Sequence, residues 1–139
     1  MKILILNGPN LNRLGKREPG VYGNWTMDMC LEHLRKEFPN VEFEYFQSNC
    51  EGALIDRLQA ADEAGDVAGV VLNAGAYTHT SVALADCLRD ICLPVVEVHI
   101  SNIYAREDFR RHSLISEACA GIVCGFGMKS YELAVRGLC

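Results

Sequence analysis

Residues 69–73 read Gly-Val-Val-Leu-Asn, a short run that is apolar up to its terminal asparagine. A run of this length and β-branched composition is typical of a strand in the centre of a parallel sheet, where helices cover both faces. It therefore predicts a buried central strand whose carboxyl end carries a polar residue, Asn73.

Further apolar runs lie on both sides of this strand. Residues 3–6 and 41–47 precede it, and residues 95–100 and 121–126 follow it. In residues 41–47 apolar and acidic side chains alternate, as expected of an edge strand near solvent. The sequence thus predicts five strands, with the second at an edge.

Segments with helical periodicity separate the strands. The predicted helices are residues 26–38, which Pro39 ends, residues 54–61, residues 81–91, which precede Pro94, and residues 128–138. Residues 101–118 are mixed and predict short helical turns. Strands that alternate with helices are the mark of a parallel sheet covered by helices.

Five such units in 139 residues predict an α/β fold. We expect one domain over residues 1–139: a flavodoxin-like, doubly wound, five-stranded parallel sheet of order 2-1-3-4-5 with right-handed crossovers. In such sheets ligands bind beyond the carboxyl ends of the strands, at the switch between strands 1 and 3. A functional site is expected there.

Composition excludes several classes of protein. Half of the residues are apolar and 22% are charged, which is ordinary for a folded chain. The net charge of −5 argues against sequence-independent binding to nucleic acid. No apolar run approaches the ~20 residues of a membrane span, and the apolar start is too short for a signal peptide. We expect a cytoplasmic protein without a nucleic-acid or membrane partner.

The sequence contains seven cysteines, an odd number that cannot pair fully within one chain. They are Cys30, Cys50, Cys87, Cys92, Cys119, Cys124 and Cys139. There is no Cys-x-x-Cys, and most lie in apolar stretches, which predicts reduced core residues. A metal site is the alternative, but the spacings match no common zinc pattern, so no metal is expected.

Polar segments follow three of the predicted strands. Residues 7–23 form a loop too long for a mere connection, and long loops in compact domains are often functional. Residues 73–81 lead into a helix N-terminus, which favours anions. In the fourth strand a period of two places Glu97, His99 and Ser101 on one side. The common nucleotide, nucleophile-elbow and zinc-protease motifs are absent.

Four segments together resemble the type II 3-dehydroquinate dehydratases. They read N-G-P-N-L-N-R-L-G-K-R-E-P-G-V-Y-G at 7–23, N-A-G-A-Y-T-H-T-S at 73–81, E-V-H-I-S-N at 97–102 and A-R-E-D-F-R-R-H-S at 105–113. The resemblance implies a cofactor-free lyase of the shikimate pathway of aromatic amino acid biosynthesis. It would convert 3-dehydroquinate to 3-dehydroshikimate by anti elimination of water through an enolate.

The resemblance also implies the catalytic residues. Tyr22 is expected to be the base, with its pKa lowered from about 10 by the guanidinium of Arg17. His99 is expected to protonate the leaving hydroxyl while Glu97 orients its ring, and Asn10 is expected to hold the enolate oxygen through a water. Taken alone, a strand histidine such as His99 is more often a core residue. Arg17 and Tyr22, taken alone, more often belong to a solvated loop.

Substrate contacts and assembly follow from the same resemblance. The expected binding residues are Asn73, Ile100 and Ser101 for the carboxylate, His79 and Arg110 for ring hydroxyls, and Asp86 in the site of a neighbouring subunit. On sequence alone Asp86 is a surface helix residue. The resemblance implies a dodecamer built from trimers.

Two other functions stay open at this stage. A flavodoxin-like module that binds FMN or a nucleotide needs a hydroxyl- and glycine-rich loop after the first strand, and Asn-Gly-Pro-Asn suits it poorly. An inactive paralogue would not need all the residues named above. The Schiff-base route of the type I enzyme is not expected, because no lysine ends an apolar strand.

Overall fold

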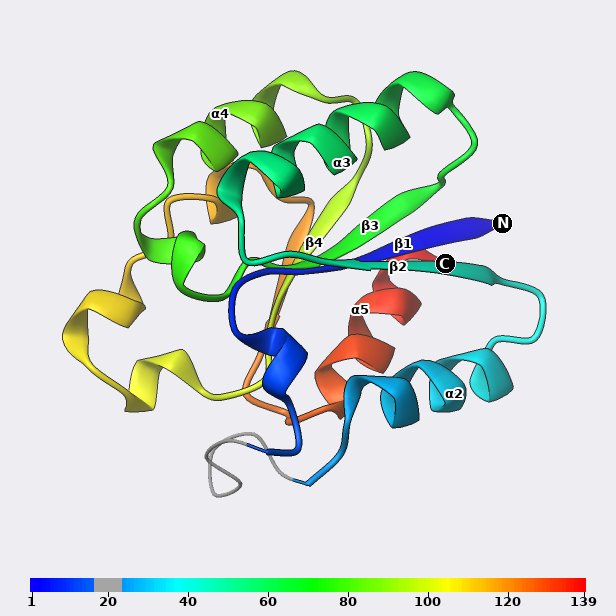
Figure 1. Cartoon of the computed structure of the whole chain (residues 1–139), viewed down its shortest axis with the longest axis horizontal. Coiled ribbons are helices and arrows are strands. Elements are labelled where there is room, and N and C mark those ends of the chain that lie inside the picture. Colours follow the sequence, from blue (N-terminus) through cyan, green and yellow to red (C-terminus); the bar gives the residue numbers. More distant parts are fainter. Residues whose placement is uncertain (17–23) are drawn as a thin grey trace.

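In residues 1–16 and 24–139, which the computed structural model describes, five strands form one parallel sheet of order β2-β1-β3-β4-β5 (Figure 1). The strands are β1 (Lys2–Asn7), β2 (Glu42–Gln47), β3 (Gly69–Asn73), β4 (Val95–His99) and β5 (Gly121–Cys124). The predicted order and the α/β class are confirmed.

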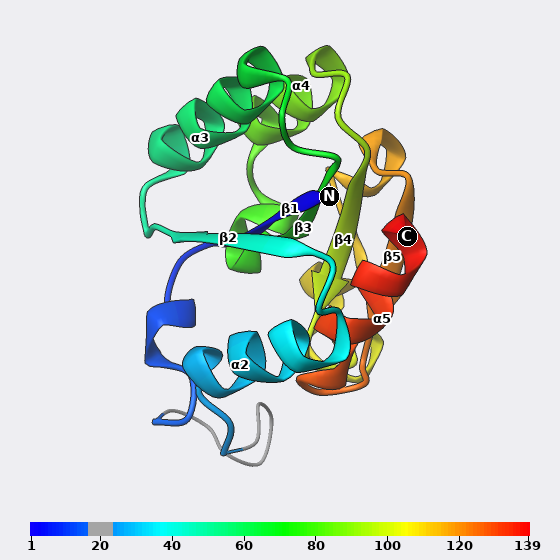
Figure 2. The ribbon, with the colours of Figure 1, turned by 90° about the vertical axis from the view of Figure 1, so that its right-hand side faces the viewer.

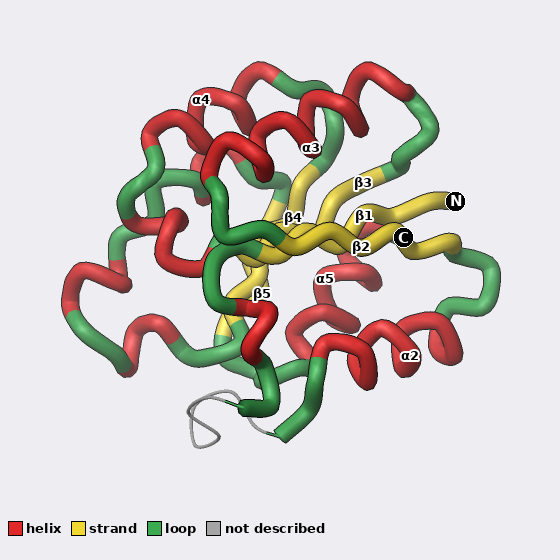
Figure 3. Tube along the Cα trace, viewed as in Figure 1, coloured by secondary structure: helices red, strands yellow, loops and turns green. Residues whose placement is uncertain are grey.

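Two helices cover each face of the sheet. Figure 2 shows α3 (Glu51–Ala64) and α4 (Val82–Asp90) above it, and α2 (Met27–Glu37) and α5 (Lys129–Leu138) below it. Short 3₁₀ turns connect the layers (Figure 3). Three of them lie in the long excursion of the chain between β4 and β5, residues 100–120. The 3₁₀ turns are η1 (Leu11–Arg13), η2 (Gly75–His79), η3 (Ile103–Ala105), η4 (Asp108–Arg111) and η5 (Ser116–Ala118).

The central strand β3 divides its side chains between two cores. Val71 packs into the cluster under α2 and α5, whereas Val70 and Leu72 pack into the cluster under α3 and α4. All five residues of β3 are buried. Because both faces of this strand are covered, its sequence is apolar throughout, as predicted.

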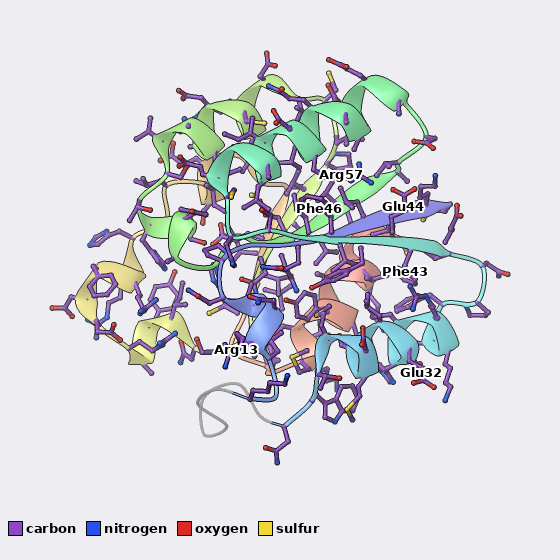
Figure 4. All side chains as sticks on the ribbon, in the orientation of Figure 1. Arg13, Glu32, Phe43, Glu44, Phe46 and Arg57 are labelled. Carbon is purple, nitrogen blue, oxygen red and sulfur yellow. The ribbon has the colours of Figure 1, made fainter. Side chains whose placement is uncertain are left out.

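Strand β2 lies at the edge of the sheet, as its alternating sequence predicts. Phe43 points towards α2 and joins that core, while Glu44 lies on the opposite face and pairs with Arg57 of α3 (Figure 4). Glu44 also accepts a hydrogen bond at 2.9 Å from Lys2. Charged groups on an edge strand discourage pairing with another chain.

Local signals set the element ends. The Thr26 hydroxyl accepts from Met29 N–H at 3.2 Å and caps α2, and the Ser81 hydroxyl caps α4 by accepting from Leu84 N–H at 2.9 Å. Strand β5 ends at Cys124, two residues earlier than predicted, because Gly125 turns into the left-handed region at φ 94°.

The prediction that the cysteines are core residues is wrong in part. All seven are free thiols, but Cys50, Cys92 and Cys139 are exposed. Cys50 and Cys139 cap helices and Cys92 follows one, so the chain turns outward at these positions. Cys30 is buried, which raises its pKa to about 12.

The described residues lack two structural features. No described helix is long and apolar enough to cross a membrane. Across residues 1–16 and 24–139, no group of three or more histidine, cysteine, aspartate or glutamate side chains is placed to hold a metal ion.

The carboxyl ends of β1 and β3 meet closely. Asn7 and Asn73 pair in register, and Gly8 N–H donates to the Asn73 carbonyl oxygen at 2.7 Å. A Cβ atom at Gly8 would lie 2.5 Å from the backbone oxygen of Ala74. Glycine therefore lets the two loops approach each other at the switch point of the sheet.

We predict that Gly8→Ala destabilises the fold by about 1–3 kcal/mol, because the added methyl group must displace backbone rather than a flexible side chain. Urea denaturation of the variant and the parent chain measures the difference. The matched control is Gly52→Ala in the first turn of α3, where a Cβ meets nothing within 4 Å. This control should be neutral or stabilising by up to about 1 kcal/mol. Equal stability of Gly8→Ala and the parent chain would contradict the close approach.

Candidate active site

A pocket lies at the carboxyl edge of the sheet, at the predicted switch point. From the loop after β1 it is lined by Pro9, Asn10 and Leu11. From the end of β3 and η2 it is lined by Asn73, Gly75, Ala76 and His79. From β4 and the segment after it, it is lined by His99, Ile100, Ser101, Ile103, Arg106 and Arg110.

The pocket brings together most of the residues expected to form a site. Asn10, Asn73, His79, His99, Ile100, Ser101 and Arg110 all line it. Glu97 lies behind His99. Arg17 and Tyr22, which are expected to provide the general base, lie outside the described residues. Asp86 does not line the pocket: it is exposed on α4, within 3.6 Å of Arg89.

His99 and Glu97 form a buried pair at the end of β4. The His99 Nε2 atom lies 2.5 Å from Oε2 of Glu97, and the two residues are 5% and 0% exposed. The strand's period of two places both on one side, as predicted. This contact occupies Nε2 and leaves Nδ1 for a ligand in the pocket that His99 lines.

Two serines that sequence reasoning did not single out complete the surroundings of Glu97. Oε1 of Glu97 accepts hydrogen bonds from Ser116 Oγ at 2.6 Å and from Ser113 Oγ at 3.1 Å. Burial by itself raises the pKa of Glu97, but the hydrogen bonds from His99, Ser116 and Ser113 outweigh it, and the pKa lies below its ordinary value. The carboxylate is therefore ionised at neutral pH.

His79 stacks against His99, with ring centroids 6.2 Å apart. Its Nδ1 lies 2.9 Å from the carbonyl oxygen of His112, so Nδ1 carries the proton and Nε2 is left as an acceptor. Burial lowers the pKa of His79, the hydrogen bond to the His112 carbonyl opposes this, and the positive charge of Arg110 lowers the pKa further. A neutral His79 can accept a hydrogen bond from a hydroxyl group in the pocket.

A second buried network fixes the side chain of Asn73. Its Nδ2 donates to Tyr131 Oη at 3.0 Å, and its Oδ1 accepts from Gly75 N–H at 3.2 Å. The hydroxyl of Tyr131, which is fully buried, donates in turn to Asn7 Oδ1 at 2.8 Å. These contacts orient the amide and leave one Nδ2–H for the pocket.

The described lining of the pocket contains arginines and no acidic residue. The Arg106 guanidinium lies 3.4 Å from Ser101 Oγ, and Arg110 Nε lies 3.0 Å from Glu107. Both arginines are partly buried, which reduces screening of their charge. The pocket therefore suits an anionic ligand, although the chain as a whole is acidic.

The family model described as "Dehydroquinase class II" matches residues 1–139. The chain belongs to this family. It is 58% identical over 138 residues to the 3-dehydroquinate dehydratase of Pelodictyon phaeoclathratiforme, covering 99% of this chain and 91% of that protein. It is 54% identical to the 3-dehydroquinate dehydratase of Chlorobaculum tepidum, covering 98% and 92% respectively. The resemblance drawn from the four sequence segments is confirmed.

Solved structures agree with this assignment. The type II dehydroquinase of Butyrivibrio crossotus superposes with a TM-score of 0.95 at 43% identity, covering 99% of this chain and 97% of that chain. The corresponding enzyme of Propionibacterium acnes gives a TM-score of 0.92 at 41% identity, covering 99% and 94%. The class II dehydroquinase fold thus extends over nearly all of the chain.

We predict that Tyr131→Phe lowers the free energy of unfolding by about 1–3 kcal/mol, because it leaves Asn7 Oδ1 without its donor and Asn73 Nδ2 without its acceptor in a buried site. Urea denaturation measures the loss. The matched control is Tyr104→Phe, at an exposed tyrosine outside the pocket, which should change stability by less than about 0.5 kcal/mol. The network would be refuted by equal effects of the two substitutions.

Proposed function

We propose that this chain converts 3-dehydroquinate to 3-dehydroshikimate by eliminating water through an enolate. The observation that carries the proposal is the buried His99–Glu97 pair, in a pocket otherwise lined by neutral hydrogen-bonding groups and arginines. Membership of the class II dehydroquinase family supports the same reaction over the FMN-binding alternative.

Substrate binding uses the groups that the networks hold in place. We assign the substrate carboxylate to the free Nδ2–H of Asn73, the backbone N–H groups of Ile100 and Ser101, and the Ser101 hydroxyl. All three residues line the pocket. His79 Nε2 and the Arg110 guanidinium are placed to receive ring hydroxyls. Because these groups are fixed before binding, little ordering is needed when the substrate enters.

The first chemical step removes a proton next to the ketone. We assign it to Tyr22, activated by Arg17, on the basis of the motif at residues 7–23. A tyrosine hydroxyl ordinarily ionises near pH 10, and a guanidinium at about 4 Å lowers its pKa by stabilising the phenolate. The pair would supply a base without a metal or a cofactor.

We assign stabilisation of the enolate oxygen to Asn10, acting through a bound water. Asn10 lines the pocket in the left-handed conformation, at φ 69°, which asparagine tolerates better than most residues. Its N–H donates to the Asn49 side chain at 2.9 Å, which holds the turn in place. A fixed donor at this point lowers the barrier because it does not reorganise as charge develops.

The second step expels the hydroxyl group as water. His99 supplies the proton, and Glu97 holds the imidazole ring and stabilises its positive charge. An ionised carboxylate against Nε2 also keeps a proton on that nitrogen, so that Nδ1 is the nitrogen that exchanges a proton with the substrate.

We further propose that the enzyme acts in the shikimate pathway, in the cytoplasm, as a dodecamer built from trimers in which Asp86 reaches a neighbouring site. Exposed apolar side chains support burial in an assembly: Phe109 is 58%, Ile122 52% and Phe126 63% exposed. Seven free thiols suit a reducing compartment.

The assay follows the ultraviolet absorbance of the conjugated enone as the protein is mixed with 3-dehydroquinate. We expect turnover by the parent chain, and a loss of about 100-fold or more in kcat for His99→Ala, because general acid catalysis is removed. The control is His33→Ala on α2, outside the pocket, which should keep parental turnover. No absorbance rise with folded protein would refute the function. Borohydride added with substrate should leave activity intact, since no Schiff base forms.

We predict that Tyr22→Phe abolishes most turnover while KM changes little, because the lost hydroxyl acts in the transition state rather than in binding. Steady-state kinetics separate the two parameters. A parallel loss, with KM rising as much as kcat falls, would make Tyr22 a binding residue.

A further inference from the structure

Glu97 occupies an unusual position for an ionised group. It lies in the middle of β4 between two neighbouring strands, and it is fully buried. An unpaired carboxylate would be very unstable there. Each of its oxygens has a partner: Oε2 faces His99, while Oε1 accepts from both Ser116 and Ser113.

The hydroxyl of Ser113 has a fixed direction. Its oxygen accepts hydrogen bonds from the backbone N–H groups of Ile115, at 3.2 Å, and Ser116, at 3.1 Å. With its lone pairs used in this way, its proton is the group that faces Glu97. The loop between η4 and η5 therefore presents Ser113 as a donor.

Ser116 is the closer donor. Its Oγ lies 2.6 Å from Oε1 of Glu97, the length of a charge-assisted O–H···O⁻ hydrogen bond. It lies in the first turn of η5 and does not line the pocket. Glu97 therefore connects the hydroxyl of Ser116 to His99, which lines the pocket.

We propose that Ser113 and Ser116 are positioning residues that keep Glu97 ionised, so that Glu97 holds His99 in the orientation and protonation state from which it delivers a proton. The inference rests on the proposed function of His99. A carboxylate that lost these donors would take up a proton more readily, and a neutral carboxyl group no longer stabilises an imidazolium.

His99, His79 and Cys119 are titratable groups that interact with the charge of Glu97. Burial, and then the charge of Glu97, raises the pKa of Cys119 to about 12, so its thiol stays neutral. The pKa of His79 is lowered mainly by burial, so it is neutral at neutral pH. The charge of Glu97 therefore acts mainly on His99.

The test substitutes Ser116, whose hydroxyl bonds Glu97 alone among the hydrogen bonds described. Removing this donor destabilises the ionised form of Glu97 more than the neutral form. Glu97 in Ser116→Ala should therefore take up a proton at higher pH than in the parent chain. Turnover of the variant relative to the parent should therefore fall as the pH is lowered. The fall should begin as the pH approaches the pKa of Glu97 and level off at about tenfold once Glu97 is protonated in both proteins, with KM little changed.

A second readout does not depend on turnover. The chain has four histidines, so ¹⁵N-labelled imidazole gives a simple spectrum in which His99 is assigned with His99→Asn. The His99 signals should report the protonation of Glu97 as an acidic inflection, and this inflection should move to higher pH in Ser116→Ala. If the parent chain has no turnover, the proposed function fails, while this titration still tests the serines.

Matched variants separate positioning from packing. Ser116→Thr retains the hydroxyl and should restore both the relative turnover and the titration. Ser130→Ala removes a buried serine hydroxyl that accepts from Phe126 N–H and makes none of the hydrogen bonds described for Glu97. This variant should lower stability, while its turnover relative to the parent chain should not change with pH. The inference is overturned if the turnover of Ser116→Ala relative to the parent chain is constant with pH. It is also overturned if the acidic inflection of the His99 signals lies at the same pH in both proteins.

Discussion

A buried charge imposes the strictest condition on this fold. Glu97 lies where neighbouring strands exclude water, so protein groups must supply every hydrogen bond that the carboxylate loses. His99 comes from the same strand, but the other two donors come from the excursion between β4 and β5. Ser116 lies in η5 and Ser113 in the loop before it, so this segment, which looks irregular in sequence, returns two hydroxyl groups to the sheet.

The same condition shapes the opposite face. Asn7 and Asn73 end adjacent strands in register, and both amides are buried beneath α5. Tyr131 satisfies both with one hydroxyl, donating to the first and accepting from the second. Each face thus has one polar network at the same edge of the sheet. Between them the networks fix the amide and the imidazole that face the pocket.

The sequence predicts what depends on short-range pattern. Apolar runs, helical periodicity and proline positions predicted the strands, their order and the carboxyl-edge site, since these depend on periodicity and chirality. It also predicted His99 beside Glu97, because a period of two is a local rule. It did not single out Ser116 or the role of Tyr131, since their partners lie 19 and more residues away. No periodicity reports such contacts.

The charge of the chain shows why composition says little about this site. At the amino end of β1, Lys2 lies within 4 Å of Glu42, Glu44 and Asp66, so acidic groups concentrate there. Arg106 and Arg110 line the pocket beyond the carboxyl ends of the strands. Exposed charges more than about 8 Å apart are largely screened at physiological salt. A ligand in the pocket therefore experiences the nearby arginines far more than the net charge of −5. An anionic substrate and an acidic enzyme are compatible because the charges are separated along the strands.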